Sequence, residues 1–400
     1  MTRRVVAVFT GNRAEYGLQF PILRAIAAHP NLEYRLLVSG AHLDKDFGST
    51  LDEIRSDGFT ISDEVHIDLP EDSLYGTALA IGNGIVSAAR ALARCKPDLL
   101  VVYADRFEGF AALVAGTQMG IPTAHVEGGD VTQGGALDDS IRHAMTKLAH
   151  LHFATNQEAA GRILAMGEEP FRVFNVGFPA IDLITEGQFA PVDEVRARFQ
   201  LVPDRPLIVF TQHSIATQYE HATDQIRPAL GALESVARDG YQVIITYPNN
   251  DAGGRRIIAE IERFREKRVP GVQFHKSVGR HTYHGLINLA GVGGTSGGSC
   301  VGNSSSGIKE TPAFGCPTVD IGSRQLGRLS AENVLHVGYD EVEIRTAIHR
   351  CVEDAEFVAA CRACENPYGN GGAGMAIAEV LASVEMGHRL LTKQMTLGGV

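Results

Sequence analysis

Two doubly wound α/β domains that face one cleft are the fold that this sequence predicts, and three observations support it. Short apolar segments alternate with longer amphipathic segments along the chain, a pattern that indicates parallel strands joined by helices. The alternation pauses between residues 181 and 205, where Gly187, Pro191 and Pro203 occur, and then restarts. With 400 residues, the chain has the length of two or three ordinary domains.

The first domain is expected to span residues 1–184 and to be Rossmann-like. Its apolar segments are short and mostly β-branched or aliphatic, as in strands that are buried on both faces. We expect strands at Val5–Phe9, Tyr34–Val38, Leu99–Tyr103, Thr123–Val126, Leu151–Ala154 and Val173–Val176. We expect helices at Gly17–His29, Thr77–Arg94, Phe107–Met119 and Ser140–Ala149.

The second domain is expected to span residues 200–370 and to repeat this organisation. Its strands are expected at Leu207–Phe210, Gln242–Thr246, Val272–His275, Cys300–Val301 and Thr318–Ile321. Its helices are expected at Asp224–Arg238, Gly254–Arg268 and Ile308–Phe314. A final helix near Gly374–Val384, within residues 374–400, follows a glycine-rich turn and could pack back onto either domain, including the first.

Composition and charge exclude several functional classes. Hydrophobic residues make up 44% of the chain, which is too apolar for intrinsic disorder. With 36 Lys and Arg against 47 Asp and Glu, the net charge of −11 argues against broad binding to nucleic acid or to an anionic membrane. The N-terminus has no signal-peptide pattern and no apolar stretch approaches ~18 residues, so we expect a cytoplasmic protein.

Cysteine usage indicates neither a disulfide framework nor a metal centre. The six cysteines are few and irregularly spaced, so in a cytoplasmic chain we expect free thiols. Cys361 and Cys364 form a lone pair without a second pair of ligands at metal spacing. We therefore predict no metal site and no cofactor.

A glycine- and serine-rich loop follows a strand of the second domain. Residues 302–307 read Gly-Asn-Ser-Ser-Ser-Gly and lead into a predicted helix. Small residues let free backbone N–H groups reach an anion, and a helix N-terminus adds positive charge. A serine helix cap is the simpler explanation, but three serines exceed what a cap needs. We predict a phosphate site formed by Asn303, Ser304, Ser305 and Gly307.

Three further residues of the second domain are candidates. Glu310, in the first turn of that helix, could accept hydrogen bonds from both ribose hydroxyls of a nucleotide, or could serve as a capping-box carboxylate. Arg324 follows the next strand and is a candidate second phosphate ligand, or a solvated loop arginine. His213 follows the first strand of this domain and could carry a proton, or could be a satisfied core histidine.

Charged residues also gather where strands of the first domain end. Asp105 and Arg106 follow one predicted strand, and Glu127 ends the next. Asp138 precedes a predicted helix, and Arg142 lies one turn further along it. A carboxylate at a strand end usually has solvent and a ligand nearby, although Asp105 could be a turn residue and Asp138 a helix cap.

The two sets of residues together suggest a substrate class. Arg13, in the polar segment after the first strand, would point into the cleft if that loop lines it, or would be a surface arginine. Several carboxylates suit chemistry through an oxocarbenium-like state, as in glycosyl cleavage. Because a diphosphate-type site is expected in the other domain, a sugar nucleotide is the substrate that joins both halves.

At this point the sequence carries a specific resemblance. The matching stretches are Thr10–Gly17, Ala104–Arg106, His125–Gly129, Asp138–His143, Thr146–Leu148, Asn175–Gly177, Gly302–Glu310, Ile321–Arg328 and Asn366–Gly371. They run nearly from end to end of the chain. On these motifs the chain resembles the hydrolysing UDP-N-acetylglucosamine 2-epimerases, both the bacterial sialic-acid and legionaminic-acid pathway type and the epimerase half of the animal bifunctional enzyme.

The resemblance implies a glycosyltransferase-B-like fold and a reaction. UDP-N-acetylglucosamine and water would give N-acetylmannosamine and UDP, by elimination of UDP to a glycal and hydration with inversion at C2. Asp105, Glu127 and Asp138 would be the acid/base carboxylates, and His213 would act near the leaving group. The residues that would hold UDP are Arg13, Arg106, Arg142, Asn303, Ser304, Ser305, Gly307, Glu310 and Arg324. The family further suggests a homodimer or homotetramer.

Two departures from the family pattern leave alternatives open. Gly291–Ser299 looks like an insertion before the phosphate loop, and Gln133–Gly135 lengthens another loop; both are expected to border the cleft. They could indicate UDP-2,4-diacetamido-2,4,6-trideoxyglucose as the substrate. A non-hydrolysing 2-epimerase, a glycosyltransferase on the same fold and an inactive sugar-nucleotide sensor are the remaining alternatives.

Overall fold

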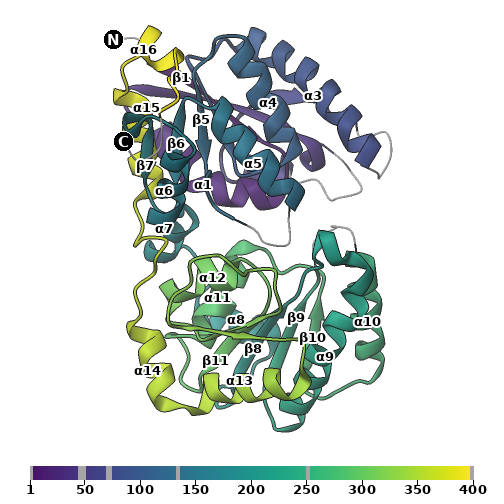
Figure 1. Cartoon of the computed structure of the whole chain (residues 1–400). Helices are drawn as coiled ribbons and strands as arrows, with labels where there is room; N and C mark the ends of the chain where they lie inside the picture. The colour runs from purple at the N-terminus through teal and green to yellow at the C-terminus, as the bar shows by residue number, and fades with distance from the viewer. Residues whose placement is uncertain (1–2, 44–50, 69–73, 132–135, 249–252, 397–400) are drawn as a thin grey trace. The chain divides into compact units, whose positions relative to one another are not determined.

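The chain forms two compact α/β units, each built around one parallel sheet (Figure 1). Unit 1 comprises Met1–Asp130, Leu137–Asp182 and Gly371–Val400, and unit 2 comprises Val131–Ala136 and Leu183–Asn370. The computed structural model describes residues 3–43, 51–68, 74–131, 136–248 and 253–396. The predicted fold class, two doubly wound parallel sheets, is confirmed.

The sheet of unit 1 has seven parallel strands in the order β3-β2-β1-β4-β5-β6-β7. The strands are β1 (Arg4–Thr10), β2 (Leu32–Ser39), β3 (Ile61–Val65), β4 (Leu99–Tyr103), β5 (Thr123–Val126), β6 (Leu151–Ala154) and β7 (Val173–Asn175). The order reverses at β1, where Val6 pairs with Tyr34 of β2 on one side and Leu99 of β4 on the other. Ligands of doubly wound sheets bind beyond the carboxyl ends of the strands at such a point.

Helices cover both faces of this sheet. They are α1 (Arg13–Ala28), α2 (Leu51–Ser56), α3 (Leu74–Cys95), α4 (Phe107–Gln118), α5 (Ala136–Leu148), α6 (Gln157–Ala165), α7 (Ala180–Thr185), α15 (Ala373–Ser383) and α16 (His388–Leu391). Alternate residues of β1 enter different cores. Val8 packs among residues of α1 and α15, while Ala7 and Phe9 pack among residues of α3 and α4. A strand buried on both faces explains the continuous apolar run in the sequence.

Unit 2 repeats the plan with six parallel strands in the order β10-β9-β8-β11-β12-β13. The strands are β8 (Leu207–Thr211), β9 (Gln242–Thr246), β10 (Val272–His275), β11 (Gly298–Gly302), β12 (Thr318–Ile321) and β13 (Val334–Val337). The order reverses at β8, which lies between β9 and β11. The carboxyl ends of β8, β11 and β12 therefore adjoin.

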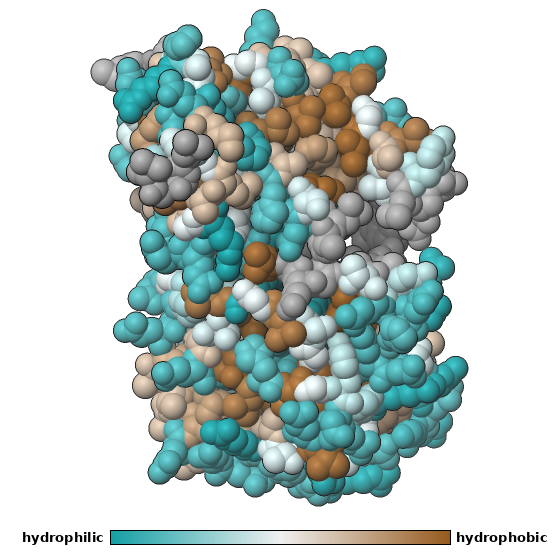
Figure 2. All heavy atoms as spheres, viewed as in Figure 1, coloured by the Kyte–Doolittle hydropathy of each residue, from teal (hydrophilic) through white to brown (hydrophobic). Residues whose placement is uncertain are grey.

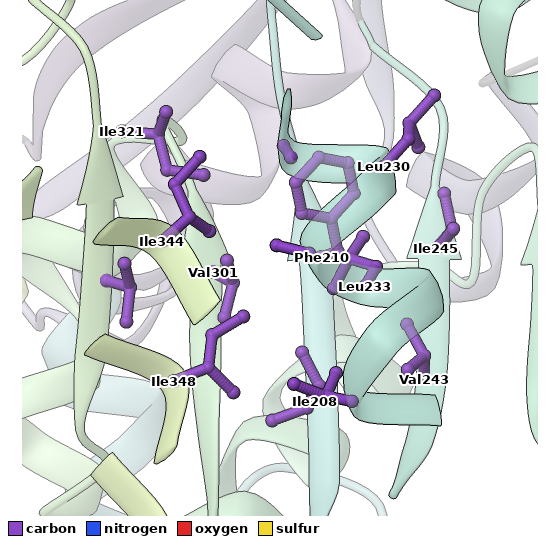
Figure 3. Close-up of a cluster of buried hydrophobic side chains, with 14 of the residues drawn as sticks. Ile208, Phe210, Leu230, Leu233, Val243, Ile245, Val301, Ile321, Ile344 and Ile348 are labelled. Carbon is purple, nitrogen blue, oxygen red and sulfur yellow. The ribbon is translucent and has the colours of Figure 1, made fainter. Parts of the chain in front are cut away.

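The helices of unit 2 are α8 (Val192–Phe199), α9 (Ala222–Arg238), α10 (Gly254–Glu266), α11 (Arg280–Ala290), α12 (Ser306–Lys309), α13 (Glu341–Glu353) and α14 (Ala355–Ala363). Figure 3 shows one core of this unit, where Ile208 and Phe210 of β8 meet Leu233 of α9 and Ile348 of α13. The intervening residue, Val209, belongs to the opposite core. Both faces of this sheet are therefore buried under helices.

Several predicted strands are confirmed residue for residue, among them Leu99–Tyr103 and Gln242–Thr246. The edge strand β3 was not predicted, because its Ile-Ser-Asp-Glu-Val sequence is exposed at alternate positions. Residues 181–205, where the predicted alternation pauses, contain most of α7 and all of α8. Pro191 occupies the position just before α8, where its missing N–H removes no hydrogen bond from the helix.

Three further expectations differ from the structure. Helix α1 begins at Arg13, not Gly17, because the side chain of Asn12 caps it by accepting from the Glu15 backbone N–H at 3.0 Å. The predicted helix at Ile308–Phe314 consists of the four-residue α12 and a 3₁₀ turn, Thr311–Phe314. Helices α2, α6, α11, α13, α14 and α16 and strand β13 were also not predicted.

The inserted segment Gly291–Ser299 does not lie where the sequence suggested. It leads into β11 at its amino end, and the Gly297 carbonyl accepts a hydrogen bond from the backbone N–H of Leu207, the first residue of β8, at 3.2 Å. Ligand sites of such sheets lie at the carboxyl ends. The segment, which was expected to border the cleft, thus adjoins the amino ends of β8 and β11, and Gln133–Gly135 lies outside the described residues.

Helix α3 has an exposed apolar face. Tyr75, Leu79 and Val86 are 68%, 41% and 49% exposed, and their spacing puts them on one side of the helix. Figure 2 shows hydrophobic side chains gathered over the part of unit 1 that contains α3 and α4. The opposite face of α3 packs into the core of unit 1 through Ala88 and Leu92.

The C-terminal segment of the chain, residues 388–396, is held to unit 1 by a buried arginine. Arg172 is 0% exposed. Its five N–H groups donate to Glu169 Oε2 at 2.7 Å and to the carbonyls of His150 at 3.2 Å, Arg389 at 2.8 Å, Leu390 at 2.7 Å and Thr392 at 3.1 Å. Such complete pairing is what allows a guanidinium to be buried.

Lys393 of the same segment ties down the end of α5. Its ammonium group lies 2.7 Å from Glu168 Oε2. It also donates to the carbonyls of Thr146, Lys147 and Ala149 at 3.4, 2.7 and 2.6 Å. These carbonyls lie at the C-terminus of α5, where a cation is favourable because the helix dipole is negative. The last described residues therefore fix a helix that carries part of the candidate site.

Arg172→Met is expected to destabilise unit 1 by about 3–5 kcal/mol, because removing one partner leaves buried polar groups unpaired. Calorimetric unfolding measures the loss, and hydrogen exchange should rise across residues 388–396. Arg90→Met on the exposed side of α3 is the matched control and should change stability by less than about 0.5 kcal/mol. Equal effects of the two changes would contradict this role for Arg172.

Candidate functional site

Asp105 and Glu127 lie at the carboxyl ends of two neighbouring strands, β4 and β5. Both turns use left-handed backbone at residues other than glycine, with φ of 53° at Ala104 and 64° at Glu127. Such conformations cost about 1–3 kcal/mol and occur preferentially at functional sites. The backbone N–H of Glu127 is held by the Phe153 carbonyl at 2.9 Å. The strand ends therefore present two carboxylates from fixed, strained turns.

Arg142 of α5 is buried among carboxylates. Its side chain is 3% exposed, it forms an ion pair with the Asp105 carboxylate, and its Nη1 lies 4.0 Å from Asp130 Oδ2. Burial would lower the pKa of Arg142, but Asp105, Asp130 and Glu127 together raise it above its usual value. The guanidinium is thus charged and turned toward Asp105, whereas the sequence predicted it as a UDP ligand.

The neutral side chain of His125 contacts both the turn that carries Asp105 and the helix that carries Arg142. His125 Nε2 lies 2.6 Å from the Ala104 carbonyl, and its Nδ1 lies 3.2 Å from Thr146 Oγ1 of α5. Burial lowers the pKa of His125 to about 3. A Cβ at Gly128 would come within 2.9 Å of both His125 Nδ1 and Thr146 Oγ1, so only glycine fits there. His125 thereby connects the turn of Asp105 to the helix of Arg142.

The other predicted residues of unit 1 lie nearby in the chain. Asp138 is in the first turn of α5, not before it, and is exposed; it precedes Arg142 by one turn and so shares its face of the helix. Arg106 is 46% exposed, and its Nε lies 3.4 Å from Glu108 Oε2. Arg13 is the first residue of α1, and its side chain lies outside the described part of the chain.

Sequence reasoning missed a pair of buried acids at the β1–β4 reversal point. Glu15 and Glu108 are 4% and 3% exposed. Glu15 accepts from the Gly11 backbone N–H at 3.3 Å and from Gln19 Nε2 at 2.7 Å. Burial, and then the charge of Glu108, raise the pKa of Glu15 to about 8, while Arg106 opposes the shift. Only the closeness of α1 and α4 in space reveals this pair, so no local motif could show it.

In unit 2, Asn303 connects three strand-end loops. Its side chain accepts from the His213 backbone N–H at 2.6 Å and donates to the His213 carbonyl at 2.9 Å. Its own carbonyl accepts from Arg324 Nη1 at 3.0 Å and from Gln325 Nε2 at 2.7 Å. Asn303 is 1% exposed. The structure thus brings the predicted residues His213, Asn303 and Arg324 together, with Asn303 as the residue that holds the other two.

The serine-rich loop follows directly. Gly302 has φ of 126°, and a Cβ there would lie 2.0 Å from the Thr211 carbonyl, so β11 can end beside β8 only with glycine at this position. Ser304 and Ser305 are partly exposed. Gly307 is buried, and a Cβ there would lie 3.1 Å from Thr318 Cγ2 of β12. The glycines let the loop lie tightly against the sheet, which leaves the two serines at its surface.

His213 is neutral in this environment. Burial, and then the positive charge of Arg324, lower its pKa to about 3. A neutral imidazole can accept a proton or donate one hydrogen bond, but it does not bring a positive charge. Glu310 lies 3.0 Å, through Oε2, from Nε2 of the buried His284, a histidine that the sequence did not single out.

Comparisons with known proteins agree with this picture. The profile of the UDP-N-acetylglucosamine 2-epimerase family matches residues 24–382. The UDP-N,N'-diacetylbacillosamine 2-epimerase (hydrolyzing) of Legionella pneumophila is 28% identical over 393 residues, 98% of this chain and 99% of that protein. The UDP-N-acetylglucosamine 2-epimerase of Neisseria meningitidis serogroup B is 29% identical over 362 residues, 89% of each chain.

A solved structure shows the same fold. The crystal structure of UDP-GlcNAc 2-epimerase from Neisseria meningitidis bound to UDP-GlcNAc superposes with a TM-score of 0.79 at 19% identity, over 94% of this chain and 99% of that chain. The fold is of the glycosyltransferase-B type. Among the described residues, no group of three or more His, Cys, Asp or Glu side chains is placed to hold a metal ion. No described helix is long and apolar enough to cross a membrane.

The raised pKa of Glu15 has a consequence for stability. Its value of about 8 in the folded chain exceeds the ordinary 4.5, so folding favours the protonated acid. Its contribution is therefore fully present below about pH 4.5 and is lost as the pH rises to about 8. Glu15→Gln keeps the shape of the neutral acid and removes the titration.

The melting temperature of Glu15→Gln, relative to the unchanged protein, should rise steadily between pH 5 and pH 8, by ~5 °C or more at the upper end. Differential scanning fluorimetry across this range provides the measurement. Glu385→Gln, at an exposed position, is the control and should show a constant difference. Parallel curves for Glu15→Gln and the unchanged protein would show that Glu15 is ionised in the folded state.

Proposed function

The chain belongs to the UDP-N-acetylglucosamine 2-epimerase family, and from that premise we propose that it is a hydrolysing UDP-2-acetamido-sugar 2-epimerase. It would convert UDP-N-acetylglucosamine and water to N-acetylmannosamine and UDP. The observation that carries the proposal is the pair of carboxylates, Asp105 and Glu127, at neighbouring strand ends with Arg142 behind them. Two carboxylates allow one proton to be removed from C2 and another to be delivered.

The first step would be elimination. The C2–H of the sugar has no adjacent carbonyl, so direct removal of the proton is difficult. Loss of UDP makes C1 cationic and acidifies C2–H. One carboxylate takes the C2 proton, the C1–O bond breaks and its electron pair leaves with UDP, which gives 2-acetamidoglucal. Carboxylates stabilise the cationic character at C1 and carry the proton.

The second step would be hydration. The oxygen of a water molecule bonds to C1 of the glycal, and C2 receives a proton on the face opposite to the one that lost it. The water's other proton goes to a carboxylate. The one proton that the enzyme has gained over both steps then passes to solvent or to the departing UDP, so the enzyme returns to its starting protonation. Asp105 and Glu127 reach the site from different strands, which suits proton transfer on two faces of one sugar ring.

Unit 2 would hold the leaving group. Ser304 and Ser305 lie at the surface of the loop after β11, and Arg324 lies after β12. Hydroxyl, backbone N–H and guanidinium donors together stabilise the charge that develops on a departing diphosphate. His213, neutral and held by Asn303, would donate or accept one hydrogen bond at the bridging oxygen. Glu310 would bind the ribose hydroxyls.

Two predicted UDP ligands would instead act as positioning residues. Arg142 is 2% exposed and forms an ion pair with Asp105 of its own unit, and Asn303 is 1% exposed and bonds through its side chain to the backbone of His213. We infer that Arg142 orients Asp105 and that Asn303 orients His213. Arg13 and Arg106 remain predicted phosphate ligands, and Asp138 remains a predicted acid/base group.

The sugar could differ from N-acetylglucosamine. The Legionella relative is named for UDP-N,N'-diacetylbacillosamine and the Neisseria relative for UDP-N-acetylglucosamine, and the two identities, 28% and 29%, do not separate them. UDP-2,4-diacetamido-2,4,6-trideoxyglucose is therefore the second candidate substrate. We also expect a cytoplasmic homodimer or homotetramer, which light scattering after size-exclusion chromatography would measure.

Proton NMR of the enzyme with each UDP-sugar in D₂O tests the proposal. We expect UDP and the free 2-epimer with deuterium at C2, because the proton added at C2 comes from a group that exchanges with solvent. Whichever sugar turns over faster identifies the substrate. An intact epimerised UDP-sugar would replace this proposal with a non-hydrolysing epimerase. UDP binding without turnover of either sugar would favour a transferase or a sensor.

Asp105→Asn and Glu127→Gln should each lower kcat by about 10²–10⁴, the usual contribution of a general acid or base. The Kd for UDP should change less than about threefold, because the residues proposed to hold UDP lie mainly in unit 2. Steady-state kinetics and calorimetry measure the two quantities. Asp193→Asn, at an exposed position of α8, is the control. Loss of UDP binding without loss of kcat would reverse the proposed roles.

A further inference from the structure

Two consecutive side chains of helix α11, Tyr283 and His284, contact residues of the candidate nucleotide site. The hydroxyl of Tyr283 lies 2.7 Å from Ser306 Oγ, which lies 3.3 Å from Ser304 Oγ. The next residue, His284, places Nε2 3.0 Å from Glu310 Oε2. One turn of one helix thus reaches both parts of the site, the serine loop and the carboxylate.

The contact between His284 and Glu310 is almost fully shielded from water. The side chain of His284 is 2% exposed and that of Glu310 is 11% exposed. The imidazole ring also packs against Phe314, with ring centroids 5.7 Å apart. Because a carboxylate only accepts hydrogen bonds, Nε2 of His284 must carry the proton of this bond. A rigid, buried donor therefore fixes one oxygen of Glu310.

His284 has no other hydrogen-bonding task among the described residues. Its Nδ1 is buried and has no hydrogen-bond partner there. A buried polar atom without a partner costs free energy, so a phenylalanine in its place would pack more favourably. The histidine is therefore best explained by the single bond that it donates to Glu310.

Resting on the proposed function, that unit 2 binds UDP, we propose that His284 is a positioning residue that makes the site select ribonucleotides. The bond to His284 fixes the rotamer of Glu310 and leaves the second carboxylate oxygen to accept from the ribose hydroxyls. A glutamate without this anchor would lose rotamer freedom on binding, and the hydrogen bond would be weaker by that cost. A site built to bind a hydroxyl rejects the analogue that lacks it, because its own polar group is then left unpaired.

Tyr283 provides the matched comparison, since it contacts the serine loop instead of the carboxylate. Tyr283→Phe removes the hydrogen bond to Ser306 and leaves the His284–Glu310 pair in place. It should weaken UDP and 2'-deoxy-UDP by the same factor. His284→Phe should act differently, by reducing the preference for UDP over 2'-deoxy-UDP.

The test is calorimetric titration of UDP and 2'-deoxy-UDP into the full-length protein and three variants. We expect the unchanged protein to prefer UDP by about tenfold or more, as for a hydrogen bond to a charged group. The ratio should fall below about threefold in His284→Phe and recover in part in His284→Gln, whose amide N–H can donate to Glu310. Tyr283→Phe should keep the ratio of the unchanged protein.

The outcomes distinguish a failure of the inference about His284 from a failure of the proposed function. If His284→Phe keeps its thermal stability and the full ratio, His284 does not set the selectivity and the inference is overturned. If His284→Phe fails to fold, His284→Leu, which also removes the hydrogen-bond donor, takes its place, and an unchanged ratio there has the same meaning. Equal binding of UDP and 2'-deoxy-UDP by the unchanged protein also overturns the inference, while leaving the proposed function intact. Absence of UDP binding overturns both.

Discussion

A positive charge buried beside the strand ends of unit 1 is the constraint on which this part of the structure depends. Arg142 is almost fully removed from water, and such a charge is tolerated only beside compensating charges, which here are the paired carboxylate of Asp105 and that of Asp130, 4.0 Å away. Helix α5, the turn after β4 and the loop after β5 must therefore keep one arrangement. His125 reinforces it without adding charge, because burial keeps its pKa low, and Lys393 fixes the far end of α5. The carboxylates are thus oriented before any substrate arrives, which is what acid/base chemistry on a sugar ring requires.

The two units share one sheet topology but hold their strand-end loops in place with different kinds of side chain. Both sheets reverse their order at the first strand, so both collect polar loops at adjoining carboxyl ends. Unit 1 organises these loops with charge, as fits a site that moves protons. Unit 2 organises them with the uncharged Asn303, whose side-chain amide pairs with the backbone N–H and C=O of His213 and whose own carbonyl accepts from Arg324 and Gln325. With an uncharged centre, Arg324 and the serine hydroxyls would be the groups that meet the proposed diphosphate, which a buried carboxylate in the place of Asn303 would repel.

The sequence predicted well whatever depends on local pattern. Strand Leu99–Tyr103 is a continuous apolar run, so its position, and with it the position of Asp105 at its end, follows directly. Strand β3 was not predicted, because an edge strand needs apolar residues only at alternate positions. The partners of charged side chains could not be predicted from the sequence, because tertiary structure determines them. Arg142 is predicted as a ligand of UDP, and its pairing with Asp105, 37 residues away, could not be read from the local sequence. The pairing of Glu15 with Glu108, and of His284 with Glu310, follows from helix packing that no local spacing encodes.

Arg142 either orients Asp105 or binds the nucleotide, and the substitution Arg142→Lys distinguishes these two roles most directly. The substitution keeps a positive charge but loses the planar fork that pairs with carboxylates. If Arg142 orients Asp105, kcat for the UDP-sugar should fall by at least about tenfold while the Kd for UDP, measured by calorimetry, stays within about twofold. If instead the Kd for UDP rises sharply and kcat at saturating substrate is unchanged, Arg142 is a ligand of the nucleotide, and the account of a preorganised carboxylate site in unit 1 is wrong.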